Sequence, residues 1–358
     1  MIDKKSLNIE WINKVSAKKR NADRILVEKV IRALLLLEGL AKINLEFVFK
    51  GGTALMLLLN SSRRLSIDID IIIQNEQKDL ESLFQKLVEE QFFNKFEPQA
   101  RITESKIIKA HYKFYYTPVH RTRVEEEYIL LDVLFEKATY QNIENFPVTS
   151  DFVISNEENI SVPVPSAEDI LGDKLTAFAP NTTGIPYFKN ETSMSMEIMK
   201  QLYDISSLFD IITDIETVAN TFKLFAEKEL GYREKSNLNH EEVINDIIET
   251  ALCVTSRGNV GEGNFDELQK GIQRVSRFIF SETFHLDKAI VSASKAAYVV
   301  SAIRFNQKRI EKFDNPQLMK EWIIDNPLWS RMNRLKKSNP EAFFYWYKMH
   351  KLIKDNNG

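Results

Sequence analysis

The sequence has a single cysteine, Cys253, which lies in an apolar stretch of helical character. No disulfide can form within the chain, and a cysteine-based metal site is not expected. No apolar run reaches the length needed to cross a bilayer, and residues 1–6 contain no apolar segment of the signal-peptide type. These absences predict a cytoplasmic protein with no membrane partner.

Metal-ligand spacing is also missing among the five histidines, and the chain has no internal repeat or low-complexity tract. His111 and His120 flank an expected strand and turn, where structural or surface roles are favoured over catalysis. The formal net charge of −3 does not suit a general nucleic-acid binder. At 358 residues, with 44% apolar and 28% charged side chains, the chain is long enough for two globular domains with their own cores.

What the sequence does contain is a pair of aspartates, Asp68 and Asp70, in an apolar run expected to form a strand at 67–73. Alternation along a strand places both carboxylates on one face. Their repulsion beside so many isoleucines is costly without a cation. Mg²⁺, or Mn²⁺ in its place, is the expected metal, because Mg²⁺ is commonly shared between one or two carboxylates and substrate phosphates. A solvated strand edge is the alternative.

A glycine pair, Gly51 and Gly52, precedes these aspartates and follows an apolar run expected to form a strand at 46–50. Glycine lets the backbone turn sharply and approach a ligand closely. If a helix begins at Thr53, its free N–H groups and dipole face an anion in that turn, and the Thr53 hydroxyl can bind a phosphate or cap the helix. A plain turn is the alternative for the glycine pair alone.

Together, Lys50-Gly-Gly-Thr-Ala-Leu55 and Arg64-x-Ser66-x-Asp68-x-Asp70 resemble the first motif of the AbiEii/AbiGii toxin family, the MenT-like nucleotidyltransferases of the polymerase-β superfold. The resemblance implies a small nucleotidyltransferase domain followed by a helical domain, acting as a toxin of a type IV toxin-antitoxin or phage-defence (abortive infection) module. It also implies nucleotide contacts from the first motif, namely Lys50, Gly51, Gly52, Thr53, Arg64 and Ser66, with Asp68 and Asp70 as catalytic metal ligands.

A third aspartate, Asp132, lies in a strand-forming run at 127–135 and shares a face with Tyr128, Leu130 and Leu134. The superfold has a third carboxylate on a neighbouring strand, which binds a second metal or activates the attacking hydroxyl. The resemblance therefore implies that Asp132 is catalytic and a metal ligand. The alternative is a strand-end aspartate that faces water or a lysine.

Further along, Ser166 and Asp169 have the spacing of a helix N-terminus, and Ile170, Lys174 and Phe178 then recur on one helical face. A lysine on a half-buried face either extends its amine to solvent or meets an anion. The family has a characteristic lysine in a Lys-Leu-x-Ala motif, so the resemblance implies that Lys174 binds the nucleotide phosphates and takes part in catalysis.

Lys200 and Asp204 are one helical turn apart, and the plain interpretation is an ion pair within the helix. The family's fourth motif resembles Lys-Asp-x-x-Asp, and its first acidic position is Gln201 in this sequence. The resemblance implies a catalytic role for Asp204 and a nucleotide contact for Lys200, and the departure at Gln201 leaves that position without an assigned role.

Basic residues gather near the C-terminus, between 331 and 354, and enclose the aromatic run at 343–347. Positive charge interleaved with aromatic side chains suits RNA phosphates and unpaired bases. The alternative is that the aromatic side chains form core and that the charges are simply solvated.

The overall prediction is an α+β protein with a small mixed sheet in a nucleotidyltransferase-like domain at 1–180 and an all-helical bundle domain at 181–358. An amphipathic helix is expected at 22–38, ending at Gly39, with another at 79–91 and a strand at 106–116. The expected helices of the second half are 197–213, 215–232, 239–254, 264–281, 286–308 and 341–354. Gly258, Gly261 and Gly263 follow no strand and are interpreted as a plain connection.

The predicted activity is metal-assisted transfer of a nucleoside monophosphate from a nucleoside triphosphate. By resemblance, the acceptor is the 3′ end of a tRNA, translation is blocked, and a separately encoded antitoxin restrains the toxin. Two alternatives remain. The same site can modify a small molecule or a protein hydroxyl, or the chain can be a nucleotide- or RNA-binding module whose catalysis has decayed.

Overall fold

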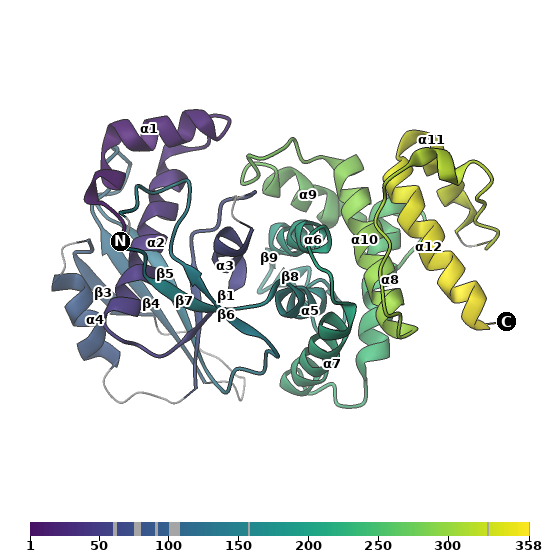
Figure 1. Cartoon of the computed structure of the whole chain (residues 1–358), viewed down its shortest axis with the longest axis horizontal. Helices are drawn as coiled ribbons and strands as arrows, with labels where there is room; N and C mark the ends of the chain where they lie inside the picture. The colour runs from purple at the N-terminus through teal and green to yellow at the C-terminus, as the bar shows by residue number, and fades with distance from the viewer. Residues whose placement is uncertain are drawn as a thin grey trace. The chain divides into compact units, whose positions relative to one another are not determined.

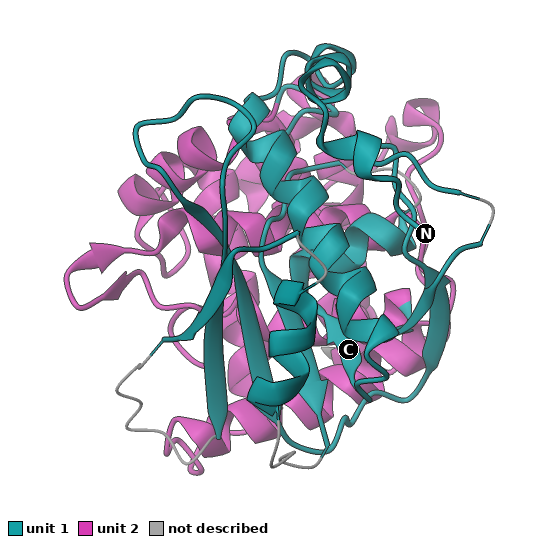
Figure 2. Cartoon of the chain, turned by 90° about the vertical axis from the view of Figure 1, so that its left-hand side faces the viewer, with its two compact units in different colours: residues 1–166, 278–283 teal, residues 167–277, 284–358 magenta. Residues whose placement is uncertain are grey.

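The computed structural model describes residues 1–59, 63–74, 80–89, 92–99, 108–156, 158–327 and 329–357, which form two units (Figure 2). Unit 1 comprises residues 1–166 and 278–283, and unit 2 comprises residues 167–277 and 284–358. Units of this kind do not define independently folding domains, so the domain boundary at 180–181 stays a prediction. The α+β class is confirmed, since a mixed sheet in unit 1 is followed by a largely helical unit 2.

Unit 1 contains a five-stranded sheet in the order β1-β2-β5-β4-β3, in which β2 and β5 are parallel and the other pairs antiparallel. The strands of this sheet are β1 (Val48–Lys50), β2 (Ile69–Ile73), β3 (Lys95–Pro98), β4 (Lys109–Tyr116) and β5 (Glu127–Phe135). The helices of unit 1 are η1 (Lys4–Leu7), α1 (Ile9–Lys18), α2 (Arg24–Lys42), α3 (Gly51–Leu58) and α4 (Leu80–Glu89). A separate hairpin pairs β6 (Ile143–Pro147) with β7 (Ser161–Pro165).

One face of the sheet is packed by helices and the other carries polar side chains. Phe84 of α4 contacts Tyr112 and Phe114 of β4, with ring centroids 4.9 and 5.4 Å apart. Residues at odd numbers in β4, such as His111 and Lys113, point to the opposite face because side chains alternate along a strand. The aromatic core around Phe84 therefore lies on the α4 side, and His111 and Lys113 lie on the other side.

Helix α2 continues past Gly39, where the sequence predicted its end. A β-carbon at Gly39 would lie 2.8 Å from Cδ2 of Leu87 in α4, so the glycine allows the two helices to pack closely. The glycine therefore serves helix packing here and does not terminate the helix.

The predicted helix at 264–281 is also too long, because the helix ends at Val275. Residues 278–283 belong to unit 1, where the carbonyl of Phe278 accepts a hydrogen bond from the amide of Leu65 at 2.8 Å and Ile279 bridges Arg64. The ring of Phe280 packs on Phe152. Burial of these apolar side chains in unit 1 prevails over their helical periodicity.

Unit 2 is built around α10 (Leu286–Arg304), which packs against α6, α8 and α12 (Figure 1). A helix that is buried on nearly every side needs small residues for close approach, and α10 supplies Ala289, Ala293 and Ala297. The other elements are α5 (Ala167–Ala177), β8 (Phe188–Lys189), β9 (Thr192–Ser193), α6 (Ser195–Phe209), α7 (Ile215–Tyr232), α8 (His240–Ser256), α9 (Phe265–Val275), η2 (Pro316–Met319), η3 (Ser330–Arg334), α11 (Leu335–Ser338) and α12 (Pro340–Asn357).

The aromatic run of α12 lies in this core. Phe343, Phe344, Tyr345 and Trp346 are all buried, and Tyr345 contacts Phe209 at a ring distance of 5.0 Å. Stacking of unpaired RNA bases on these four rings, which the sequence left open, is therefore wrong for this structure. No helix in the described part of the chain is long and apolar enough to span a membrane.

Candidate active site

Four charged or polar side chains form a row across the polar face of the sheet in unit 1. In the strand register, Lys50 of β1 lies opposite Asp70 of β2, Asp70 opposite Asp132 of β5, and Asp132 opposite His111 of β4. Residues that pair directly across strands point to the same face. Asp70 and Asp132 are therefore neighbours, although they lie 62 positions apart in the sequence (132 − 70).

Gly51 closes one side of Asp70. It has a φ of +81°, and a β-carbon there would lie 2.1 Å from Oδ2 of Asp70. Only glycine combines that backbone angle with so close an approach. The start of α3 is thus built directly against the carboxylate.

Gly52 is similarly covered by the side chains of Arg64 and Ser66. A β-carbon at Gly52 would lie 2.6 Å from Nη2 of Arg64 and 2.8 Å from Oγ of Ser66. Arg64 is buried, and its Nη1 donates to the carbonyl of Leu65 at 3.1 Å. The structure therefore brings the predicted nucleotide-binding residues of the first motif together at the glycine pair.

Thr53 lies inside α3 and is fully buried, since the helix begins at Gly51 and not at Thr53. Its hydroxyl donates to the backbone carbonyl of Asp68 at 2.6 Å. Asp68 directly precedes β2, and its side chain is exposed. Thr53 thus fixes the backbone at Asp68, while a direct contact of Thr53 with a nucleotide stays a prediction.

His111 is the residue that the sequence analysis missed. Its Nδ1–H donates to Oδ1 of Asp132 at 2.6 Å, because an ionised carboxylate can only accept. The side chain of His111 is 9% exposed and that of Asp132 is 29% exposed. The sequence favoured a structural or surface role for His111, and its opposition to Asp132 depends on the strand register, which the sequence does not reveal.

The carboxylates of Asp70 and Asp132 fit a divalent metal. Both come from adjacent strands and both remain partly accessible. No group of three or more His, Cys, Asp or Glu side chains among the described residues is arranged to hold a metal ion. Mg²⁺ requires less, because it keeps several waters and takes one or two carboxylates together with substrate phosphates. The donor chemistry of Asp70 and Asp132 matches that requirement.

In unit 2, Lys174 of α5 pairs with Asp204 of α6. The distance from Nζ to Oδ2 is 2.8 Å, and the two side chains are 8% and 3% exposed. The amide oxygen of Gln201 accepts a second hydrogen bond from Lys174 at 3.0 Å. An ammonium has three N–H donors, so two are used here. Gln201, which the sequence left without an assigned role, is therefore a second partner of Lys174.

Lys200, the remaining predicted residue, lies one position from Gln201 on α6. Its Nζ is 3.5 Å from Oε1 of Glu197. The structure gives Asp204 a partner on another helix, Lys174, while the ion pair between Lys200 and Asp204 that the sequence suggested stays a prediction. The nucleotide contact of Lys200 stays a prediction.

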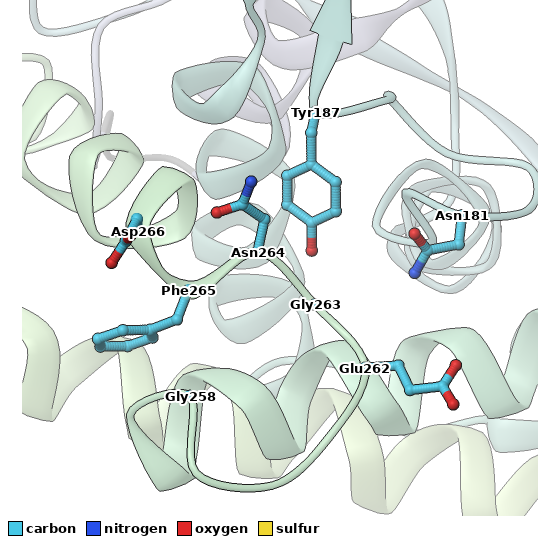
Figure 3. A pocket seen from close by; sticks show the side chains of 8 residues that line it. All are labelled: Asn181, Tyr187, Gly258, Glu262, Gly263, Asn264, Phe265 and Asp266. Atoms are coloured by element: carbon cyan, nitrogen blue, oxygen red, sulfur yellow. The ribbon is translucent and has the colours of Figure 1, made fainter.

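A hollow of about 580 Å³ also opens on unit 2, lined by Asn181, Tyr187, Gly258, Glu262, Gly263, Asn264, Phe265 and Asp266 (Figure 3). The tyrosine hydroxyl points toward the loop that carries Gly263 and Asn264, and burial raises the pKa of Tyr187 to about 12. This loop joins α8 to α9, so its glycines follow no strand, as the sequence indicated. None of the predicted site residues lines the hollow.

Comparison with known families identifies the chain. Residues 35–343 match the family described as nucleotidyl transferase AbiEii toxin, type IV TA system. The chain belongs to the AbiEii family. It is therefore a nucleotidyltransferase toxin of a type IV toxin-antitoxin system, which implies a nucleotide substrate and an antitoxin. The resemblance read from the first motif is confirmed, and the match includes every predicted site residue of this AbiEii protein.

Among solved structures, the AbiEii protein is similar to JHP933 from Helicobacter pylori, with 15% identity, a TM-score of 0.42, and 86% of this chain and 94% of that chain covered. It is also similar to an antigenic nucleotidyltransferase-like protein from Paracoccidioides brasiliensis, with 14% identity, a TM-score of 0.35, and 59% and 93% covered. These similarities assign no role to any residue of this chain. No curated protein matches the sequence.

Proposed function

We propose that this AbiEii protein is a metal-dependent enzyme that transfers a nucleoside monophosphate to the 3′ end of a tRNA and thereby blocks translation. The observation that supports it most is the pair of neighbouring carboxylates, Asp70 and Asp132, with the backbone of Gly51 built against the first of them. Carboxylates beside a glycine turn and a helix N-terminus suit a metal-bound triphosphate.

In the proposal, Asp68, Asp70 and Asp132 hold Mg²⁺ or Mn²⁺. The metal would neutralise charge on the phosphates when bound. The turn at Gly51 and Gly52 offers backbone N–H groups to the phosphates, because the first N–H groups of a helix have no partner within it. Lys50, Arg64 and Ser66 contribute positive charge and a hydroxyl donor beside the same turn.

Lys174 also binds the phosphates in this proposal, using its remaining N–H donor, while Asp204 and Gln201 hold the ammonium in place. Lys200 adds a further positive charge. The acceptor hydroxyl attacks the α-phosphorus, a new oxygen–phosphorus bond forms, and pyrophosphate leaves. A carboxylate receives the hydroxyl proton. Asp132 suits this role better than Asp204, because its side chain is 29% exposed and that of Asp204 only 3%.

The proposal is tested by incubating the purified chain with each α-labelled nucleoside triphosphate, Mg²⁺ and total RNA, then separating RNA, protein and small molecules. We expect label at the 3′ end of tRNA, none after the metal is removed with EDTA, and none from the double variant Asp68→Ala, Asp70→Ala. Glu144→Ala, an exposed carboxylate of β6 in the same unit, is the control that should retain full transfer.

The outcomes separate the alternatives. Label that persists in the double aspartate variant would refute the assigned site. Label in the protein or small-molecule fraction would replace tRNA with another acceptor at the same site. Tight nucleotide binding by the wild-type chain without any transfer would identify a decayed, binding-only module.

A further inference from the structure

The hydrogen bond between His111 and Asp132 gives the active-site carboxylate a fixed orientation. We infer that His111 is a positioning residue for Asp132: its Nδ1–H holds one carboxylate oxygen so that the other side of the carboxylate faces its neighbour Asp70. This inference rests on the proposed function, in which Asp132 binds metal or receives a proton. His111 itself touches neither nucleotide nor metal in this assignment.

The geometry favours positioning over simple space filling. The Nδ1 to Oδ1 distance is 2.6 Å, slightly shorter than the roughly 2.7–2.9 Å of N–H···O hydrogen bonds between charged groups. His111 is 9% exposed, although its face of β4 also carries the exposed Lys109 and the half-buried Lys113. A polar ring that is buried on the polar face of a sheet needs a partner, and Asp132 supplies it.

The side chains of Asp132 and His111 differ in exposure, which indicates the side from which a ligand can approach Asp132. The side chain of Asp132 is 29% exposed and can still be reached from solvent, whereas the ring behind it is nearly closed off. The register places Asp70 on one flank of Asp132 and His111 on the other. The histidine thus occupies the flank away from Asp70 and leaves the flank toward Asp70 for a ligand.

The hydrogen bond also fixes the tautomer of the imidazole. Because the carboxylate of Asp132 accepts a hydrogen bond from Nδ1, the neutral imidazole of His111 carries its proton on Nδ1. A residue that orients a metal-ligating or catalytic group typically changes affinity or activity by about 10–100-fold when it is removed. We therefore expect His111→Phe to lower nucleotide transfer by about 10–100-fold while the melting temperature changes little.

Two polar variants provide a matched pair. In His111→Asn the amide nitrogen sits where Nδ1 was, so this variant should recover most of the transfer activity. In His111→Gln the amide nitrogen lies at the position of Nε2, so this variant should remain impaired. The two substitutions are similar in polarity, so a role in packing alone would not separate them.

A double-mutant cycle shows whether His111 acts through Asp132. The loss caused by His111→Phe should disappear in the Asp132→Asn background. Nitrogen NMR of the metal-free wild-type chain should show a protonated Nδ1 that is protected from exchange, and this signal should weaken in Asp132→Asn. The NMR experiment depends neither on turnover nor on bound metal, in the wild-type chain or in the variant.

Each result decides the inference. It is supported by loss in His111→Phe, recovery in His111→Asn but not His111→Gln, and absence of the effect in Asp132→Asn. Equal activity of all three His111 variants with the wild type, or equal loss in the Asn and Gln variants, would overturn it while leaving the proposed function intact. A wild-type chain with no transfer to any acceptor would instead refute the proposed function, and this inference with it.

Discussion

The ion pair between Lys174 and Asp204 allows stability and activity to be separated by mutation. Lys174→Met leaves the Asp204 carboxylate, whose side chain is 3% exposed, without the ammonium that lies 2.8 Å away. Removing one partner of a buried pair costs about 3–5 kcal/mol. At about 2–4 °C per kcal/mol for a unit of this size, we expect the melting temperature to fall by about 6–20 °C.

The double variant Lys174→Met, Asp204→Leu should behave differently. Replacing both partners of a buried pair by apolar side chains is often neutral or stabilising, so the melting temperature should return near that of the wild type. Nucleotide transfer should stay lost, because the proposed phosphate-binding amine is absent. Calorimetry and the labelled-nucleotide assay measure the two quantities on the same preparation.

A surface pair provides the control. Lys308 and Glu216 are 3.4 Å apart with side chains 81% and 67% exposed, so Lys308→Met should cost less than about 1 kcal/mol and leave transfer unchanged. Full transfer by the double variant of Lys174 and Asp204 would show that the lysine is purely structural. A melting temperature of Lys174→Met equal to that of the wild type would contradict the burial argument itself.

Three further outcomes are expected. Gly51→Ala should lose about 1–3 kcal/mol of stability in denaturant unfolding, because the φ of +81° and the closeness of Asp70 exclude a side chain at this position. Gly231→Ala is the control and should be neutral or stabilising, because nothing lies within 4 Å of a β-carbon there. Burial raises the pKa of Cys253 from 9.0 to about 11, so the folded thiol should resist Ellman's reagent at pH 8 and react once unfolded. The folded state holds this proton more tightly than the unfolded state, so the thiol's contribution to stability is present below pH 9 and is lost as the pH rises through about 11, a dependence that Cys253→Ala should remove. Asp246→Ala should destabilise unit 2 by about 1–3 kcal/mol in thermal unfolding, because it removes the acceptor of the Asn181 and Thr182 amides, at 2.9 and 2.8 Å; an unchanged melting temperature would contradict this.

Local pattern predicted much of the fold. The period of the apolar residues indicated β5 at its observed bounds, Glu127–Phe135, and α7 at its observed bounds, Ile215–Tyr232. The pattern failed where tertiary contacts decide the outcome. Residues 278–283 were assigned to a helix, but their apolar side chains are buried in unit 1. Periodicity carries no information about which unit buries a segment.

The candidate site shows the same limit. Gly51 and Asp70 could be linked from sequence, because a short helix joins their strands and the motif is local. The opposition of Asp132 to His111 could not, because it depends on a strand order in which β5 lies between β2 and β4. A histidine with no metal-ligand spacing gives no signal by itself. Its partner appears only once the register is known.

The two groups of predicted residues differ in how much rearrangement ligand binding demands. Asp68 is exposed and Asp132 is 29% exposed, so the proposed metal can reach both carboxylates from solvent. Lys174 is 8% exposed and two of its three donors are already used. An ammonium that exchanged Asp204 for phosphate in every cycle would break this buried ion pair each time, at a cost of several kcal/mol. If Lys174 binds phosphate as proposed, we therefore expect it to keep Asp204 as its partner, so that Asp204 acts on the nucleotide only through the lysine.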